Sequence, residues 1–541
     1  MRRLPILLAL AVALAAAGAG AAATINGTSR GETIRGTPGA DVIDGRAGND
    51  RIDGLGGSDA LRGGTGADRL SGGDGNDRLA AQGDGTPDRV LCGAGDDVAN
   101  IDGRDAASAD CELVARRISR AVGRIGGQPQ TEVEPDSFSW GRTVVAAFQV
   151  GRYAGGGAAA IGWARSRNGR TWRAGLLPGL RPKHNSSVVV SDPVVAYDAR
   201  HRTWLVAALR AGEDEDGLLV SRSRNGLAWK QALVAARGDG DTFDKDWIAC
   251  DNGRRSPFRG HCYLSYWNVP EGTIETRVST DGGATWSGPV AVRGLDRARG
   301  EVNGAQPVIR PDGTLLVVYV SYLDGVADVI LAARSTDGGR TFADPVQVAE
   351  VSERDVYGMR SPLLPSAAVD AGGRIYVAWH ECGLRPDCAG DDLILATSAD
   401  GRTWSDARRI PAALGFPDGS DFFTPALAVR PGTRGSGAHV AVTYYVAPPC
   451  ELGTCEVRVG LVESTNGGAT WRIPQRLDAQ AMDTNWIADG GFGQMLADYI
   501  STSWFAGRPV AVFALSSPPI RGQLHQSIFA ARVPPSGLRK R

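Results

Sequence analysis

A nine-residue repeat at residues 36–80 constrains the fold more than any other feature of this 541-residue chain. Each copy holds two glycines, at Gly36 and Gly39 in the first, and an aliphatic residue such as Ile43. Two residues after the second glycine comes an aspartate, at Asp41, Asp50, Asp59, Asp68 and Asp77. Because the period of nine holds at four positions together, a flexible Gly/Asp linker is the weaker interpretation.

The repeat predicts a very short strand in each copy. Glycine permits turns with φ > 0, and one aliphatic residue in nine suits a thin core. Stacked coils would align the aspartates in a ladder of like charges. Residues 24–111 hold 16 acidic side chains against nine arginines, in a chain of formal net charge -1. A cation between the coils would remove the repulsion, and carboxylate and carbonyl oxygens suit Ca2+.

This pattern resembles the RTX-type (hemolysin-type) calcium-binding nonapeptide repeats. The resemblance implies a parallel β-roll that folds on binding Ca2+, with the five aspartates as its ligands. We expect the roll at residues 24–115, with a disulfide-clipped cap after the last coil, and a linker at 116–130. Removal of Ca2+ should then unfold the roll and spare the rest of the chain.

A second repeat governs the remainder of the chain. Ser279–Trp286 reads S-T-D-G-G-A-T-W, and six such boxes begin at Ser166, Ser223, Ser279, Ser335, Ser398 and Ser464. The Asp/Asn-Gly core of each box predicts a tight turn with the terminal aromatic packed beneath it, which is a structural role. Repetition of four-stranded sheets at this period predicts a β-propeller.

These boxes resemble the Asp boxes (BNR repeats) of the sialidase-like superfamily, spread over residues 131–541. The expected fold class is therefore all-β, with an N-terminal parallel β-roll followed by an Asp-box β-propeller. A last unit without a box, at residues 494–533, has three predicted strands. We expect a segment near the propeller's N-terminus to supply its fourth strand, so seven blades are favoured and six are the alternative.

The N-terminus and the cysteines predict the compartment. Residues 1–23 have a charged start, a short apolar run and a small-residue A-x-A site, as in a secretory signal peptide. No other stretch is apolar for long enough to span a bilayer. The eight cysteines form close pairs that favour disulfides over a metal site: Cys92/Cys111, Cys250/Cys262, Cys382/Cys388 and Cys450/Cys455. We expect a secreted, extracellular protein.

The loops between strands two and three, and the segments that enter the inner strands, are the expected place for function, on the face opposite the box turns. The sialidase resemblance implies three arginines, an acid/base aspartate and a tyrosine activated by a glutamate. The candidate catalytic residues are Asp246, Tyr499, Arg360 and Glu381. Further acids in the entering segments are Asp136, Asp192, Asp244, Glu301 and Asp421.

Two observations weaken a catalytic interpretation. Tyr499 fits a packed strand tyrosine better than a nucleophile. The family's Arg-Ile-Pro motif occurs only at Arg409 and Arg472, directly after Asp boxes and so on outer strands, and the arginine triad has no assignment.

Two functions are therefore compared. The first is a secreted calcium-binding protein whose propeller binds extracellular glycans or surface proteins, with an acidic or aromatic pore. The alternative is an exo-glycosidase of sialidase type, with several arginines converging on one pore mouth. The net charge of -1 gives no support to nucleic acid as a partner, and the sequence does not predict an oligomeric state.

Overall fold

The computed structural model describes residues 21–120, 125–128, 130–180, 188–212, 217–230, 233–237, 242–292, 301–323, 326–413, 415–450 and 455–534. These residues confirm the all-β class. Their helical structure is limited to three short 3-10 turns: η2 (Pro386–Cys388), η3 (Gly435–Gly437) and η4 (Thr484–Trp486). Most of the predicted signal peptide, at 1–20, lies outside the described residues. Within them, no helix has the length and apolar character to cross a membrane.

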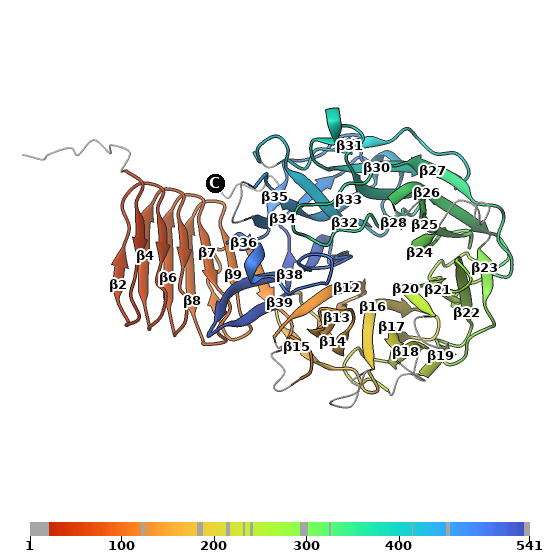
Figure 1. Ribbon diagram of the computed structural model, residues 1–541, viewed down its shortest axis with the longest axis horizontal. Helices are drawn as coiled ribbons and strands as arrows, with labels where there is room; N and C mark the ends of the chain where they lie inside the picture. The colour runs from red at the N-terminus through yellow and green to blue at the C-terminus, as the bar shows by residue number, and fades with distance from the viewer. Residues whose placement is uncertain are drawn as a thin grey trace, which may run out of the picture.

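The N-terminal repeats form the predicted parallel β-roll, the stack of coils at the left of Figure 1. One of its sheets contains β1 (Thr24–Asn26), β3 (Val42–Asp44), β5 (Ala60–Arg62), β7 (Arg78–Ala81), β9 (Val98–Ile101) and β11 (Leu113–Arg117). The other contains β2 (Thr33–Arg35), β4 (Arg51–Gly56), β6 (Arg69–Asp74), β8 (Arg89–Ala94) and β10 (Ala106–Ala107). Each coil thus spans two repeats, because successive copies alternate between the sheets.

The repeated aliphatic residues fill the thin core of the roll. Ile43 lies opposite Leu61 in the parallel register, and Ile52 opposite Leu70. All four side chains are buried in one apolar cluster. The Cys92–Cys111 disulfide joins the last coils, as predicted.

The second region is a ring of antiparallel sheets whose strands follow one another in chain order (Figure 1). The first eight strands are β12 (Glu132–Trp140), β13 (Thr143–Arg152), β14 (Ala158–Ser166), β15 (Trp172–Leu176), β16 (Val189–Asp198), β17 (Thr203–Ala211), β18 (Gly217–Ser223) and β19 (Leu233–Arg237). Two four-stranded sheets follow: β20 (Phe243–Cys250), β21 (Cys262–Asn268), β22 (Thr273–Ser279) and β23 (Val290–Val292), then β24 (Val302–Ile309), β25 (Leu315–Leu323), β26 (Val326–Ser335) and β27 (Val346–Glu350).

The remaining strands complete the ring. They are β28 (Ser366–Val369), β29 (Ile375–Glu381), β30 (Asp392–Ser398) and β31 (Arg408–Ile410), then β32 (Asp421–Val429), β33 (Val440–Ala447), β34 (Glu456–Ser464), β35 (Gln475–Arg476) and β36 (Met482–Asp483), then β37 (Ser501–Phe505), β38 (Arg508–Ile520) and β39 (Gln523–Arg532). The inner strands β12, β16, β20, β24, β28, β32 and β37 contact one another in this order, and β37 contacts β12. They surround a central pore.

Strand β11 joins the roll to the ring. It pairs with β9 in parallel and with β39 in antiparallel orientation, so nine strands form one continuous sheet. Asn100 of the roll adds a buried link, since its amide donates to the Leu477 carbonyl and accepts from the Ala479 N–H. The fourth strand of the last sheet thus comes from the N-terminal side, and the predicted boundary between 115 and 116 falls inside β11.

The Asp boxes form turns between the third and fourth strands of their sheets, as in the turn from β22 to β23. In that turn Asp281 Oδ1 accepts the N–H groups of Ala284 and Thr285. Partial burial acts to raise the pKa of Asp281, but hydrogen bonds from Thr285, Ser279 and Ala284 lower it to about 2. These bonds use the carboxylate fully, so the box is structural.

The other three predicted disulfides also form: Cys250–Cys262, Cys382–Cys388 and Cys450–Cys455. The last two clip the loops between strands two and three of their sheets, opposite the box turns.

Candidate functional site

The mouth of the central pore is lined by residues at β-bulges near the start of the inner strands. Glu134, Asp192, Lys245 and Thr424 have φ angles of 49°, 50°, 47° and 50°, at the register shifts of β12, β16, β20 and β32. Left-handed backbone is unusual for residues with a Cβ, and a bulge re-aims the side chain at that position. Repetition of the bulge therefore points several charged side chains toward one centre.

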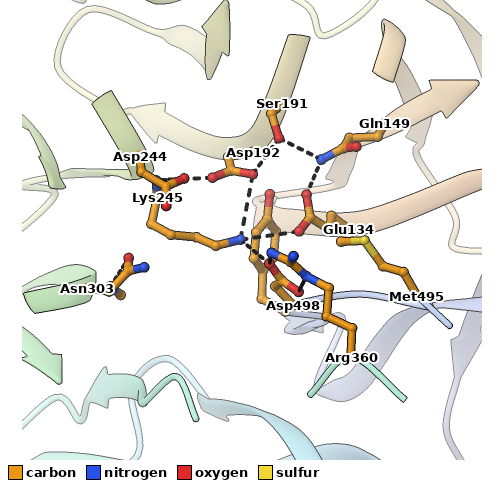
Figure 2. Close-up of polar contacts among 12 residues, drawn as sticks. Glu134, Gln149, Ser191, Asp192, Asp244, Lys245, Asn303, Arg360, Met495 and Asp498 are labelled. Carbon is orange, nitrogen blue, oxygen red and sulfur yellow. Dashed lines mark hydrogen bonds and ion pairs between the residues drawn. The ribbon is translucent and has the colours of Figure 1, made fainter. Parts of the chain in front are cut away.

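Lys245 is the centre of a buried ionic network, to which Glu134, Asp192 and Asp498 converge (Figure 2). Its Nζ lies 2.6 Å from Asp498 Oδ2, 3.3 Å from Glu134 Oε1 and 3.7 Å from Asp192 Oδ1. Arg360 holds Asp498 from the other side in a bidentate pair, with Nε–Oδ1 and Nη2–Oδ2 distances of 2.8 and 2.7 Å. Asp498 thus binds two cations at once.

The pKa values reflect this pairing. Burial acts to lower the pKa of Lys245, but Asp192, Asp498 and Glu134 hold it well above its usual range. Burial acts to raise the pKa of Asp498, but Lys245 and Arg360 hold it well below its usual range. Burial raises the pKa of Glu134 to about 8, although the attraction of Lys245 acts to lower it.

Asp246, a predicted catalytic residue, lies beside this network and forms no ion pair among the described residues. Only 1% of it is exposed, and neither carboxylate oxygen has a hydrogen-bond partner. Burial, reinforced by Asp192, raises its pKa well above the usual range. It lines a cavity of about 30 Å³ with Thr424 and Tyr499. Because ligand pockets in proteins are roughly 300–1,000 Å³, a sugar does not fit there.

Tyr499, the predicted nucleophile, is packed into the pore wall. Its hydroxyl donates to the Pro193 carbonyl at 3.3 Å, and its ring makes an edge contact with Trp247. Lys245 Nζ lies 5.5 Å from the centre of the ring. Burial, reinforced by Glu134, raises the pKa of the hydroxyl well above its usual range, which disfavours the nucleophilic phenolate.

The other two candidates lie in different surroundings. Arg360 belongs to the network, through Asp498. Glu381 ends β29, where it is 5% exposed and accepts the Ser352 N–H. Among the described residues, no hydrogen bond or ion pair links Glu381 to the pore network.

Two features of the sequence mark the residues of the network and of the bulges. Lys245 is one of only four lysines in the chain. Glu134, Asp192 and Thr424 each precede a proline, which is a recurring mark of the bulge positions. The juxtaposition of Lys245 with Asp498, 253 residues later, depends on closure of the ring.

The aspartates of the roll form the predicted ladder. One oxygen of each accepts a backbone N–H two repeats earlier, as in Asp59 Oδ1 with Asp41 N at 2.8 Å and Asp68 Oδ1 with Asp50 N at 2.7 Å. The other oxygen is buried without a partner in Asp50, Asp59, Asp68, Asp77 and Asp97. Burial raises the pKa of Asp59 and of Asp68 to about 6.

The first glycine of each repeat makes room for this second oxygen. A Cβ on Gly54 would lie 2.3 Å from Asp59 Oδ2 and 2.6 Å from the Gly72 carbonyl oxygen, and Gly45 and Gly72 have equivalent surroundings. A carboxylate oxygen and a backbone carbonyl of the next coil thus face the same space. Unpartnered carboxylates beside carbonyls are the oxygen ligands that Ca2+ prefers, so the residues fit the ion.

The ladder extends further than the sequence predicted. Asp88, Asp97 and Asp105 continue it, each accepting a backbone N–H of an earlier ladder residue. Two extra residues near 84–87 lengthen the spacing from 18 to 20, which hid the continuation. The carboxylates of the ladder come from separate coils. Among the described residues, no three His, Cys, Asp or Glu side chains gather in a compact metal-binding group.

Residues 26–61 and 53–86 match the family of RTX calcium-binding nonapeptide repeats. This segment of the chain therefore consists of RTX repeats, which are calcium-binding. Comparison with curated proteins gives no match.

Several solved structures share features of the fold. A leech intramolecular trans-sialidase is 13% identical with a TM-score of 0.41, over 58% of this chain and 65% of the leech protein, which is less than two thirds of its length. A Hadza microbial sialidase is 16% identical with a TM-score of 0.42, over 78% and 68% of the chains. An ulvan lyase is 12% identical with a TM-score of 0.45, over 76% and 95%.

Proposed function

We propose that this is a secreted calcium-binding protein whose propeller binds extracellular glycans or surface proteins without cleaving them. One observation carries the proposal: the charged groups of the pore neutralise one another in a buried network. Lys245 and Arg360 are both bound to Asp498, and Lys245 also to Glu134. The cations that would hold an anionic substrate are thereby used within the chain.

Hydrolysis of a glycosidic bond needs two carboxyl groups on either side of the bond, in a site that admits the sugar. Asp246 and Tyr499 are 1% and 7% exposed and share a cavity that is smaller than a sugar. The sialidase pattern of three arginines around one mouth is not assembled by the described residues, since among their arginines only Arg360 forms an ion pair with the network. These features favour binding over catalysis.

An exo-glycosidase is the second candidate, and one observation favours it. Burial raises the pKa of Glu134 to about 8 beside the cationic Lys245, and raises that of Asp246 well above the usual range. A carboxyl group that stays protonated at neutral pH is suited to general acid catalysis. Opening of the pore mouth would be needed before such a group met a substrate.

In the roll, we propose that Asp41, Asp50, Asp59, Asp68 and Asp77 bind Ca2+ together with backbone carbonyls, and that Asp88, Asp97 and Asp105 extend the series. The bound ion would neutralise the ladder. We also propose that the propeller has seven blades, the last completed by β11. The roll would then be a calcium-stiffened arm continuous with the propeller rather than a domain on a flexible linker.

The test is turnover of a fluorogenic sialoside and a panel of aryl glycosides by the mature protein in millimolar Ca2+, alongside binding to a glycan array. We expect binding without turnover. Turnover that is lost in Asp246→Asn or Tyr499→Phe, but kept in the exposed control Tyr357→Phe, would contradict the proposal and establish the glycosidase.

A further inference from the structure

A groove lies where the roll meets the first blade, away from the pore network. Its volume is about 810 Å³, larger than the pore cavities. Strands β11 and β15 border it, with the last coil of the roll and the first Asp-box turn. Its charged and aromatic lining consists of Arg104, Arg116, Arg117, Arg120, Arg170 and Trp172, with two acids, Asp102 and Asp105.

The two acids do not neutralise the arginines. Asp102 and Asp105 are 3% and 6% exposed, and their carboxylates accept backbone N–H groups of the roll. Asp105 also accepts the N–H of Asp102. Three of the four carboxylate oxygens are therefore occupied by backbone N–H groups, whereas Asp102 Oδ1 is buried without a partner.

The five guanidinium groups have no carboxylate of the described residues at ion-pair distance. Among the described residues, none of the five forms an ion pair within 4.0 Å, although other arginines do, such as Arg360 and Arg458. Arg116 donates only to the backbone carbonyls of Asp102 and Asp105. The Nε of Arg117 is buried without a hydrogen-bond partner. Arg116 and Arg117 feel only the longer-range attraction of the buried carboxylates Asp105 and Glu132, so an anion in the groove could pair directly with the guanidinium groups.

We propose that this groove binds an anionic polysaccharide, through the sulfate or carboxylate groups of successive sugar units. Guanidinium forks recognise both groups by bidentate hydrogen bonds. Trp172 lines the groove and is partly exposed, so it offers an aromatic surface to a sugar ring. This inference rests on the proposed function of a glycan-binding protein and names the class of glycan.

Charge elsewhere in the molecule favours a glycan over nucleic acid. The chain has a net charge of -1, and the neighbouring roll is acidic. A duplex needs a broad basic face, because its phosphates repeat every few ångströms along both strands. A single groove with acidic surroundings fits one thinner anionic chain.

The experiment measures binding of the mature protein to immobilised heparin, polygalacturonate, neutral dextran and duplex DNA, in millimolar Ca2+ at two salt concentrations. We expect binding to heparin or polygalacturonate, weakening with salt, and none to dextran. Arg120→Ser/Arg170→Ser removes two exposed groove arginines. Because each of these guanidinium groups would donate charge-assisted hydrogen bonds to the ligand, we expect the affinity to fall by at least about tenfold.

The matched control is Arg340→Ser/Arg402→Ser. These arginines occupy the Asp-box position of Arg170 in other sheets, are exposed, and change the net charge equally. We expect the control to bind like the wild type, and circular dichroism to show both variants folded.

Three results would overturn the proposal that the groove binds an anionic polysaccharide. They are an equal loss of affinity in both double variants, no binding to either anionic glycan, or tighter binding to DNA than to both glycans. Failure of the proposed function is distinguishable from these. Turnover in the glycoside panel would contradict a non-catalytic propeller, and it would leave the groove comparison between the two double variants unaffected.

Discussion

The roll and the pore of the propeller both bury several carboxylates, but they balance the charge differently. In the pore, Lys245 and Arg360 are supplied by the chain and bind the acids directly. In the roll, Asp59 and Asp68 each satisfy one oxygen with a backbone N–H and leave the other buried without a partner. No arginine or lysine forms an ion pair with either ladder residue among the described residues.

The comparison shows which buried acids need a ligand from outside the chain. A buried charge is tolerated when it is paired, protonated or bound to a metal. The Lys245 network is paired within the chain, although Asp246 beside it is buried without a hydrogen-bond partner. The roll is incomplete, and its glycines keep open the space beside the unpartnered oxygens. The same residue type therefore marks a structural network in one region and a cation site in the other.

Chelation of Ca2+ should separate the two regions most strongly. We expect EGTA to remove one of two thermal transitions of the full chain and to reduce its far-ultraviolet circular dichroism by the contribution of the roll. The propeller transition should stay, since its pore charges are paired internally. Mg2+ in place of Ca2+ should not restore the roll, because it demands a smaller octahedral site. A single thermal transition that EGTA leaves unchanged would contradict this difference between the roll and the propeller.

Lys245→Met should break the balance in the pore. It leaves Asp498 with Arg360 alone, and Glu134 and Asp192 with no cation at ion-pair distance among the described residues. Removal of one partner from a buried ion pair typically costs about 3–5 kcal/mol. Chemical denaturation of the propeller transition measures the loss. The control Lys230→Met changes an exposed lysine and should stay within about 0.5 kcal/mol. Equal effects of both variants would show that the network does not stabilise the fold.

Acid should partly replace Ca2+ in the roll. Burial raises the pKa of Asp59, Asp68 and Asp97 to about 6 and that of Asp88 to about 8. Carboxyls with a raised folded-state pKa favour folding below the unfolded value near 4, and this stabilisation is lost as pH rises through 6 to 8. In EGTA we therefore expect the circular dichroism of the roll to recover as the pH falls from 8 to 5. Further loss on acidification would contradict this.

Gly54→Ala tests the space beside the ladder. Its Cβ would lie 2.3 Å from Asp59 Oδ2 and displace that oxygen. We expect Ca2+ affinity, measured by calorimetry, to fall by roughly 10–100-fold, as when a ligand's orientation is disturbed. Gly103→Ala is the control, since no atom lies within 4 Å of its added Cβ. Unchanged Ca2+ affinity in Gly54→Ala would show that the space beside Gly54 is not part of the calcium site.

The regular parts of the molecule could be predicted from the sequence because local spacing determines them. The period of nine places Ile43 and Ile52 in the core and aligns the aspartates. The Asp-box turns follow from hydrogen bonds within a few residues, such as those of Asp281. The close spacing of Cys382 and Cys388 likewise indicated their disulfide.

The pore could not be predicted in the same way. Its partners come from different sheets, and Lys245 meets Asp498 only when the ring closes. Residue type and position on an entering segment, a two-to-three loop or an inner strand indicate the four candidates, but they do not distinguish a paired side chain from a free one. The dual role of β11 was hidden for a similar reason, since its second partner, β39, lies more than 400 residues later.

Hydrogen–deuterium exchange of the full chain, with and without Ca2+, tests the central claim most directly because it locates the change. We predict that in EGTA peptides from residues 24–111 lose their protection, while those covering the Lys245 bulge and the inner strands β12 and β20 keep theirs. Roll peptides that stay protected in EGTA would contradict a calcium-dependent ladder. If the pore peptides lost as much protection as the roll peptides, the claim that the pore charges are paired within the chain would be contradicted.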